Sequence, residues 1–106
     1  MIQILKKFLR FPKSVNYKEL IMQGALIIDV RSRYEYKTGH IINSINIPVD
    51  QLDVNMDKLV DKEIPIVICC SSGVRSAKAK NLLKSFGFRN THNAGSWRKL
   101  RYQISR

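Results

Sequence analysis

The sequence contains no apolar run that approaches the roughly 20 residues needed to cross a membrane. Residues 1–13 also lack the continuous apolar segment and small-residue cleavage site of a secretory signal. Hydrophobic residues make up 44% and charged residues 25% of the 106 positions. These proportions are typical of a soluble globular protein, and the length suits one domain with an ordinary core.

Cysteine is scarce, and its placement excludes a disulfide framework. The two cysteines, Cys69 and Cys70, are sequence neighbours. Their Cα atoms lie about 3.8 Å apart across a trans peptide, whereas disulfides usually need about 4.4–6.8 Å. We therefore expect free thiols, a reducing compartment and a cytoplasmic location.

Acidic residues are few. The chain has 8 Asp and Glu against 19 Lys and Arg, a formal net charge of +11. Such a charge favours anionic small molecules, nucleic acid or anionic membranes without choosing among them. Because no basic motif interleaved with aromatic residues occurs, we expect no nucleic acid as the main ligand.

Residues 1–13 have the pattern of a basic amphipathic helix that ends at Pro12. One half of the helical wheel is apolar and the other is basic. This extension would dock on the domain itself, pair with another subunit, or lie on an anionic membrane surface. The first two interpretations are favoured, because apolar helix faces are usually buried in a core.

The most informative stretch is the loop Cys70-Ser71-Ser72-Gly73-Val74-Arg75-Ser76. It follows residues 64–69, an apolar β-branched segment typical of a buried strand, and precedes a predicted helix at 77–86. Small side chains let backbone N–H groups converge on one point, where a helix N-terminus adds partial positive charge. Such a position typically lowers a cysteine pKa from about 8.5 to about 3.5–7.5, which makes a nucleophile. The alternative is an inert buried thiol.

Strand and helix patterns alternate along the rest of the chain. A helix is predicted within residues 14–24, with Asn16 and Glu19 spaced as in a capping box, followed by a buried strand at 25–30. A crossover helix is predicted at 50–60 with Asp50 as its N-cap, and a weak strand at 88–93. This alternation predicts a parallel sheet with helices on both faces, whose carboxyl edge carries Cys70.

Three motifs resemble signatures of the rhodanese (sulfurtransferase) family. Cys-x-x-Gly-x-Arg-Ser resembles its active-site loop: four residues separate Cys70 from Arg75, one fewer than in related phosphatases. A second set resembles the family's first signature, and a third, closing the domain, has Ala94 in place of a glycine. The second set comprises Asp29-Val30-Arg31, Glu35-Tyr36, Gly39-His40-Ile41 and Asn46-Ile47-Pro48, and the third is Asn93-Ala94-Gly95-Ser96-Trp97.

The resemblance implies a rhodanese-like α/β domain over residues 14–101, with a central parallel sheet of about five strands and helices on both faces. Residues 1–13 would be an extension and residues 102–106 a basic tail. Asn43-Ser44 departs from a common Gly-Ala pair, but Asn tolerates the left-handed backbone that a turn needs. Residues 14–24 resemble the start of the family's domain, which implies a short lead strand followed by the first helix.

The implied activity is transfer of a sulfane sulfur from thiosulfate or another persulfide donor to cyanide or a thiol. Cys70 would be the catalytic nucleophile. We expect no cofactor or metal; the acceptor would be glutathione or a thioredoxin-like protein. The loop residues that would bind the anionic donor are Ser71, Ser72, Gly73, Val74, Arg75 and Ser76.

Other motif residues are expected to be structural. Charges such as Asp29 and Arg31 at a strand end usually fix loops through ion pairs, and His40 would tie its loop to the core. Trp97 would pack on the core near the sheet edge.

Two other functions fit the same residues. One is a weakly catalytic sulfur-carrier or binding module, tethered to a partner or membrane by residues 1–13. The other is a phosphatase or arsenate reductase that uses the Cys70 thiolate. The short loop argues against a phosphatase, and the lack of a well-placed resolving cysteine argues against a reductase.

Overall fold

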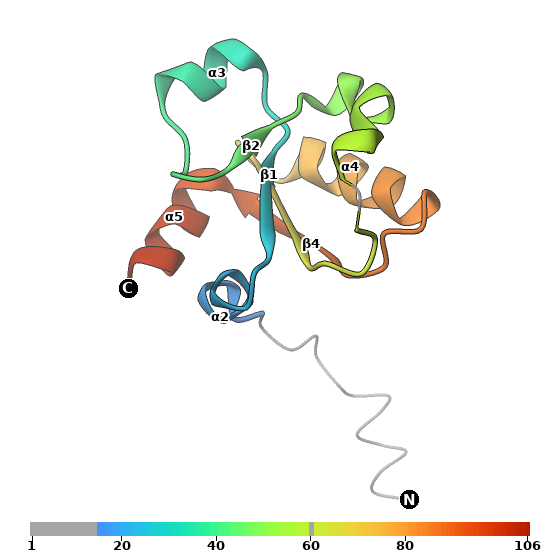
Figure 1. Cartoon of the computed structure of the whole chain (residues 1–106). Helices are drawn as coiled ribbons and strands as arrows, with labels where there is room; N and C mark the ends of the chain where they lie inside the picture. Colours follow the sequence, from blue (N-terminus) through green and yellow to red (C-terminus); the bar gives the residue numbers. More distant parts are fainter. Residues whose placement is uncertain (1–14, 60) are drawn as a thin grey trace, which may run out of the picture.

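The computed structural model describes residues 15–59 and 61–106, which form an α/β domain around one parallel sheet (Figure 1). The strand order is β2-β1-β3-β4, and each neighbouring pair is parallel. The predicted α/β class, the parallel sheet and the buried strand within residues 25–30 are thus confirmed, and this strand lies inside the sheet. The strands are β1 (Leu26–Asp29), β2 (Ile45–Asn46), β3 (Ile66–Cys70) and β4 (Thr91–Ser96).

The described part of the chain has four strands, against the expected number of about five. Residues 15 and 16, where we expected a lead strand, are exposed and belong to no strand. Asn16 instead serves as the N-cap of α2 (Tyr17–Met22), its side chain accepting the Glu19 N–H at 3.0 Å. An N-cap satisfies a backbone donor that the helix itself leaves free. Asn16 therefore begins the helix and does not extend a strand.

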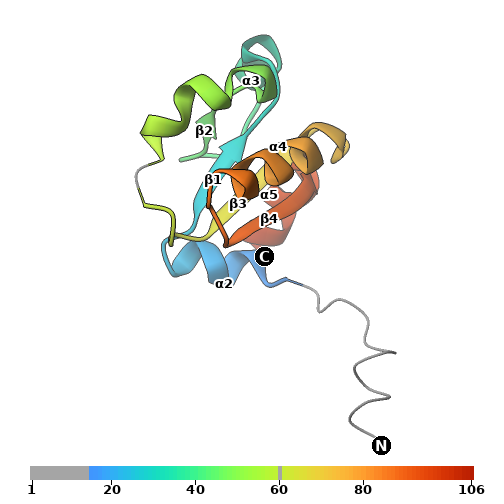
Figure 2. The same ribbon diagram turned by 90° about the vertical axis from the view of Figure 1, so that its right-hand side faces the viewer.

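Helices cover both faces of the sheet. One face carries α4 (Val74–Ser85) and two 3-10 segments, η1 (Val49–Gln51) and η2 (Asp53–Lys58). The other face carries α2 and α5 (Trp97–Ser105), as the two views at right angles show (Figures 1 and 2). The remaining helix, α3 (Arg33–Thr38), follows β1 at the carboxyl edge of the sheet.

Alternation along the strands divides the core into two clusters, one on each face. Ile28, Ile66, Ile68 and Cys70 face α4 and the 3-10 segments. The strand residues that alternate with these, Ile27, Val67 and Cys69, face α2 and α5. They belong to a second cluster, which also contains Ile41, Trp97 and Leu100. Because successive strand residues point to opposite faces, the adjacent cysteines lie in different cores.

Several predicted boundaries move for local reasons. The crossover helix expected at 50–60 is instead η1 and η2, with Asp50 inside η1 and not at its N-cap. Asn55 leaves helical geometry (φ −111°, ψ 15°), and its side-chain amide donates to the Gln51 carbonyl at 2.7 Å. Side-chain bonds of this kind compete with the backbone ladder of an α-helix.

The end of the chain also differs from expectation. Helix α5 runs through Ser105, so residues 102–105 of the expected tail continue the helix. Ile104 packs against the second core cluster, and the Lys18 ammonium donates to the Arg106 carbonyl oxygen. β4 begins at Thr91, three residues after the predicted start, while Phe88 is buried in the first cluster.

The amphipathic pattern at 1–13 lies outside the described residues. Among the residues that the structure describes, no helix has the length and apolar character to span a membrane.

A buried ion pair fixes the segment after β1. The Arg31 guanidinium donates to both carboxylate oxygens of Asp29, from Nε at 3.0 Å to each oxygen and from Nη2 at 2.7 Å to Oδ2. It also donates to the Gly39 carbonyl at 2.7 Å, beyond the end of α3, and lies over the ring of Trp97. Asp29 and Arg31 therefore hold loops in place, as the sequence predicted.

We expect Asp29→Asn to lower the free energy of unfolding by about 3 kcal/mol, because it leaves a buried guanidinium without its counter-charge. Chemical denaturation measures this loss. The control is Asp57→Asn, which removes the same charge from an exposed position and should stay within about 0.5 kcal/mol of the parent. Equal effects of the two substitutions would contradict the role assigned to this pair.

Candidate active site

The predicted loop joins β3 to α4 at the carboxyl edge of the sheet. β3 ends at Cys70 and α4 begins at Val74, three residues before the predicted start. The N-cap is Gly73, whose φ of 102° is left-handed, a conformation in which a residue with a Cβ would be strained. This turn brings the Gly73 N–H within 3.0 Å of the Cys70 Sγ, to which it donates.

Hydrogen bonds converge on the Cys70 sulfur. Its side chain is fully buried, and burial by itself raises the pKa of the thiol. Hydrogen bonds from the Ser76 hydroxyl, when its proton faces the sulfur, and from the backbone N–H groups of Ser76, Gly73 and Ser72 favour the thiolate and outweigh burial, so the pKa of Cys70 lies below its ordinary value. Cys70 therefore has the environment of a nucleophilic thiolate.

Cys69 has the opposite environment. It is fully buried against α5, and both burial and the neighbouring Asp29 carboxylate raise its pKa, to about 12. Both cysteines are free. Of the two adjacent thiols, only Cys70 has a pKa below the ordinary cysteine value.

Arg75, predicted as a cation for the substrate, is engaged in a two-pronged ion pair. Its Nη1 donates to Glu35 Oε1 at 2.6 Å and its Nη2 to Glu35 Oε2 at 3.0 Å. Ser71 completes the group, since its hydroxyl donates to Glu35 and accepts from Arg75. The guanidinium is about one-third exposed, so the loop carries its positive charge beside an equal negative one.

The first turn of α3 holds Glu35 in position. The Ser32 side chain accepts the Glu35 N–H, and the Glu35 carboxylate accepts the Ser32 N–H, which together make a capping box. The Arg75 guanidinium lowers the pKa of Glu35 far below its ordinary value, although burial opposes it. The ion pair is therefore present at neutral pH and is lost only as the pH falls well into the acid range.

A β-bulge in β4 brings another side chain to the loop. Ile68 pairs with Asn93 and Cys69 with Gly95, which leaves Ala94 as the extra residue. The Asn93 side chain accepts the Gly95 N–H at 2.9 Å and donates to the Gly73 carbonyl at 3.1 Å. Its Oδ1 also accepts from Ser76, at 2.5 Å. Asn93 thus links the bulge to the turn that surrounds Cys70.

Other predicted site residues lie in different surroundings. Ser71 and Ser72 are exposed and Val74 is 75% exposed, so its side chain points to solvent, whereas Ser76 is fully buried beside the sulfur. Arg75 also lines a hollow of about 420 Å³ between α3 and η1. The hollow's other walls come from Val30, Ser32, Arg33, Pro48, Val49, Asp50 and Gln51.

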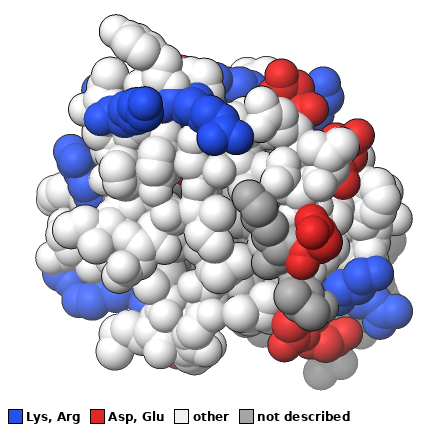
Figure 3. Space-filling view, turned by 45° about the horizontal axis from the view of Figure 1, so that its top comes forward, with Lys and Arg blue, Asp and Glu red and all other residues white. Residues whose placement is uncertain are grey.

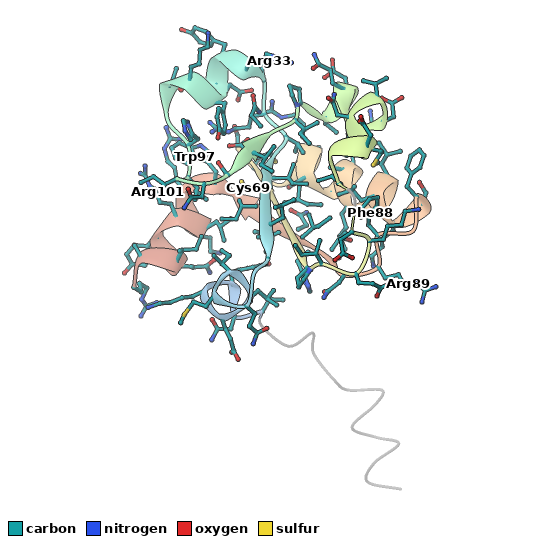
Figure 4. All side chains as sticks on the ribbon, in the orientation of Figure 1. Arg33, Cys69, Phe88, Arg89, Trp97 and Arg101 are labelled. Atoms are coloured by element: carbon teal, nitrogen blue, oxygen red, sulfur yellow. The ribbon has the colours of Figure 1, made fainter. Side chains whose placement is uncertain are left out.

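Trp97 and Asn43 have the structural roles expected for them, whereas the role of His40 differs from the prediction. Trp97 is 4% exposed and packs in the second core cluster, as predicted (Figure 4). His40 is exposed; its ring stacks on Tyr36 with centroids 3.8 Å apart, so it braces α3 and not the core. Asn43 takes the left-handed conformation expected for its turn, with φ 71°.

Sequence reasoning missed the roles of Glu35 and Asn93. Glu35 was visible as the last residue of Ser32-x-x-Glu35, a capping-box pattern, but nothing in the spacing joins it to Arg75, 40 residues away. Asn93 is the third residue of β4 and lies directly before the bulge, an irregularity of which the sequence gives no sign.

The family and structural comparisons agree with this geometry. The model of the rhodanese-like domain matches residues 14–101, and the chain belongs to that family. A solved rhodanese with anions from E. coli is 30% identical, with a TM-score of 0.67 over 71% of this chain and 89% of that one. The human single-domain sulfurtransferase TSTD1 is 31% identical, with a TM-score of 0.70 over 78% and 87%.

Curated relatives carry a different name. A tRNA uridine(34) hydroxylase of Hamiltonella defensa subsp. Acyrthosiphon pisum (strain 5AT) is 40% identical over 90 residues, covering 79% of this chain and 25% of the relative. The protein of the same name from Yersinia pestis (strain Pestoides F) is 40% identical over 73 residues, covering 64% and 21%. The chain therefore spans about a quarter of the length of these relatives.

We expect one thiol to ionise at a pH below the ordinary cysteine value, because donors surround Cys70 while Cys69 stays neutral to about pH 12. The ultraviolet absorbance of the thiolate, followed during a pH titration, measures this. The transition should disappear in Cys70→Ser and persist in Cys69→Ala. A transition that persists in Cys70→Ser would show that Cys70 is not the thiol that ionises.

Proposed function

We propose that this chain is a sulfurtransferase domain that carries sulfane sulfur as a persulfide on Cys70. The observation that carries the proposal is the Gly73 N–H that donates to the Cys70 sulfur at the start of α4, with the Ser76 hydroxyl oxygen 3.3 Å from the same atom. A cradle of donors stabilises negative charge on sulfur, whether that charge lies on the thiolate or on the terminal sulfur of a persulfide.

The proposed reaction proceeds in two displacements. The Cys70 thiolate attacks the outer sulfur of the donor, a new S–S bond forms, and the donor's S–S bond breaks. With thiosulfate the departing group is sulfite, which takes the bonding electron pair. Cyanide or an acceptor thiolate then attacks the outer sulfur of the Cys70 persulfide and releases the thiolate again.

The charge around the loop favours a particular donor. Arg75 is the only basic residue between Cys70 and Ser76, and Glu35 neutralises it. A doubly charged thiosulfate would have to compete with this carboxylate for the guanidinium. We therefore propose that persulfides of small thiols or proteins are better donors than thiosulfate, with glutathione or a thioredoxin-like protein as acceptor.

The test is the mass of the intact protein and of its peptides after incubation with thiosulfate or with glutathione persulfide. We expect a gain of one sulfur atom on Cys70, faster with the persulfide, and its removal by cyanide.

Cys69→Ala is the matched control, since it removes the neighbouring thiol and should leave the gain intact, whereas Cys70→Ser should abolish it. No gain with either donor, in protein whose Cys70 ionises as expected, would refute sulfur transfer and favour the tethered binding module.

A second candidate function is a part in tRNA modification. Its support is the name of the curated relatives, tRNA uridine(34) hydroxylase, at 40% identity over 90 residues. Charge distribution adds to it, because five of the eight acidic residues lie between positions 50 and 63, while α5 has three basic residues and no acidic one. On the face shown in Figure 3, the acidic side chains gather along one side.

If α5 contacts tRNA, loss of Arg98 and Arg101 should weaken binding more than loss of two charges elsewhere. Both guanidinium groups lie over the Trp97 ring, at 4.9 and 4.8 Å. We expect the double alanine variant to bind tRNA several-fold more weakly, measured by filter binding at fixed salt. The control is Lys78→Ala with Lys84→Ala on α4. Equal losses would mean attraction by net charge alone.

A further inference from the structure

The Ser76 hydroxyl lies between two acceptors but has one proton to donate. Its oxygen is 3.3 Å from the Cys70 sulfur and 2.5 Å from Asn93 Oδ1. Ser76 is fully buried, so the hydroxyl is shielded from solvent. A serine hydroxyl donates one hydrogen bond at a time, so its proton serves either the sulfur or the amide oxygen.

Backbone partners fix the orientation of Asn93. Its Nδ2 lies 3.1 Å from the Gly73 carbonyl oxygen, which can only accept, and its Oδ1 lies 2.9 Å from the Gly95 N–H, which can only donate. Exchange of the amide oxygen and nitrogen would break both bonds. The atom that faces Ser76 is therefore an acceptor, and a contact of 2.5 Å between two oxygens requires the Ser76 proton between them.

This arrangement has a consequence for the sulfur. While Ser76 donates to Asn93, its oxygen presents lone pairs to Cys70, which suits a thiol that donates its S–H but opposes a thiolate. We propose that Asn93 is a positioning residue that holds the Ser76 proton away from Cys70, and that the thiolate forms when this hydroxyl turns from Asn93 to the sulfur. The thiol proton passes to water in that step.

The inference deepens the proposed function, because it rests on Cys70 as the reactive thiol and concerns when that thiol becomes charged. Asn93 favours the neutral thiol. The Ser76 hydroxyl can donate to the thiolate only after it gives up its short hydrogen bond to Asn93. Asn93 thereby keeps the pKa of Cys70 above the value that the Ser76 hydroxyl and the backbone donors would give without it.

Other charges around Cys70 are paired and would be unchanged by substitutions at Asn93. Arg75 is held by Glu35, and Arg31 by Asp29 at the end of β1. Cys69 is neutral up to about pH 12. A shift in Cys70 ionisation on replacing Asn93 thus reports the hydroxyl and the loop.

The experiment is a double-mutant cycle read by thiolate absorbance in a pH titration, each protein being corrected by its own Cys70→Ser counterpart. We expect Asn93→Leu to lower the pKa of Cys70 by about one unit, which is about tenfold more thiolate at a pH below the transition. Ser76→Ala should raise it. In the Ser76→Ala background, Asn93→Leu should not lower the pKa of Cys70.

A purely structural role for Asn93 predicts a different result. Loss of its bonds to Gly73 and Gly95 would loosen the loop equally with or without Ser76, so the two backgrounds would shift alike and upward. That outcome, or a raised pKa in Asn93→Leu alone, would overturn the inference. If Asn93→Leu does not unfold cooperatively, Asn93→Ala takes its place with the same expectations.

Ionisation is measured without a sulfur donor, so the two proposals fail separately. If the double-mutant cycle gives the expected pKa shifts but no persulfide forms on Cys70, sulfur transfer alone is refuted. Persulfide formation with equal shifts in both backgrounds would refute only the role of Asn93.

Discussion

The site depends on burying a sulfur that must carry charge. Removal of a thiolate from water is costly, and in this fold the cost is offset by donors that the chain cannot place without a sharp turn after β3. The left-handed conformation of Gly73 makes that turn, aims its N–H at the sulfur and starts α4. Asn93 on β4 and Glu35 on α3 hold this turn through the Gly73 carbonyl and the Arg75 guanidinium.

Two ion pairs at this edge have different tasks. Asp29 and Arg31 are buried and bind the end of β1 to the loop beyond α3 through the Gly39 carbonyl. Glu35 and Arg75 are about one-third exposed and join α3 to the loop that begins at Cys70. The first pair fixes the scaffold, while the second sets the charge that a substrate meets.

The pairing of Arg75 bears on the choice between functions. A loop whose cation is neutralised relies on backbone and hydroxyl donors, which stabilise one charge on sulfur better than the several oxygens of thiosulfate or phosphate. Membership of the rhodanese-like family and likeness to solved sulfurtransferases agree with chemistry at sulfur. The second proposed function, a part in tRNA modification, rests on the name of the curated relatives.

The sequence alone determined the class of fold, the parallel sheet, its two buried apolar strands and the loop that begins at Cys70. Those features rest on short-range patterns: an apolar β-branched strand, small loop residues and helical spacing follow each other directly along the chain. The role of Asp29 and Arg31 was also predictable, because the two residues are near neighbours at a strand end.

Only the tertiary structure decided how charge and protons are distributed at the site. The partner of Arg75 is 40 residues away, and the partner of Ser76 is 17 residues away on a strand shifted by a bulge. The kink at Asn55, by contrast, is local, because its side-chain amide bonds to the Gln51 carbonyl four residues earlier. Long-range contacts arise from how strands and helices pack, which local sequence patterns do not encode.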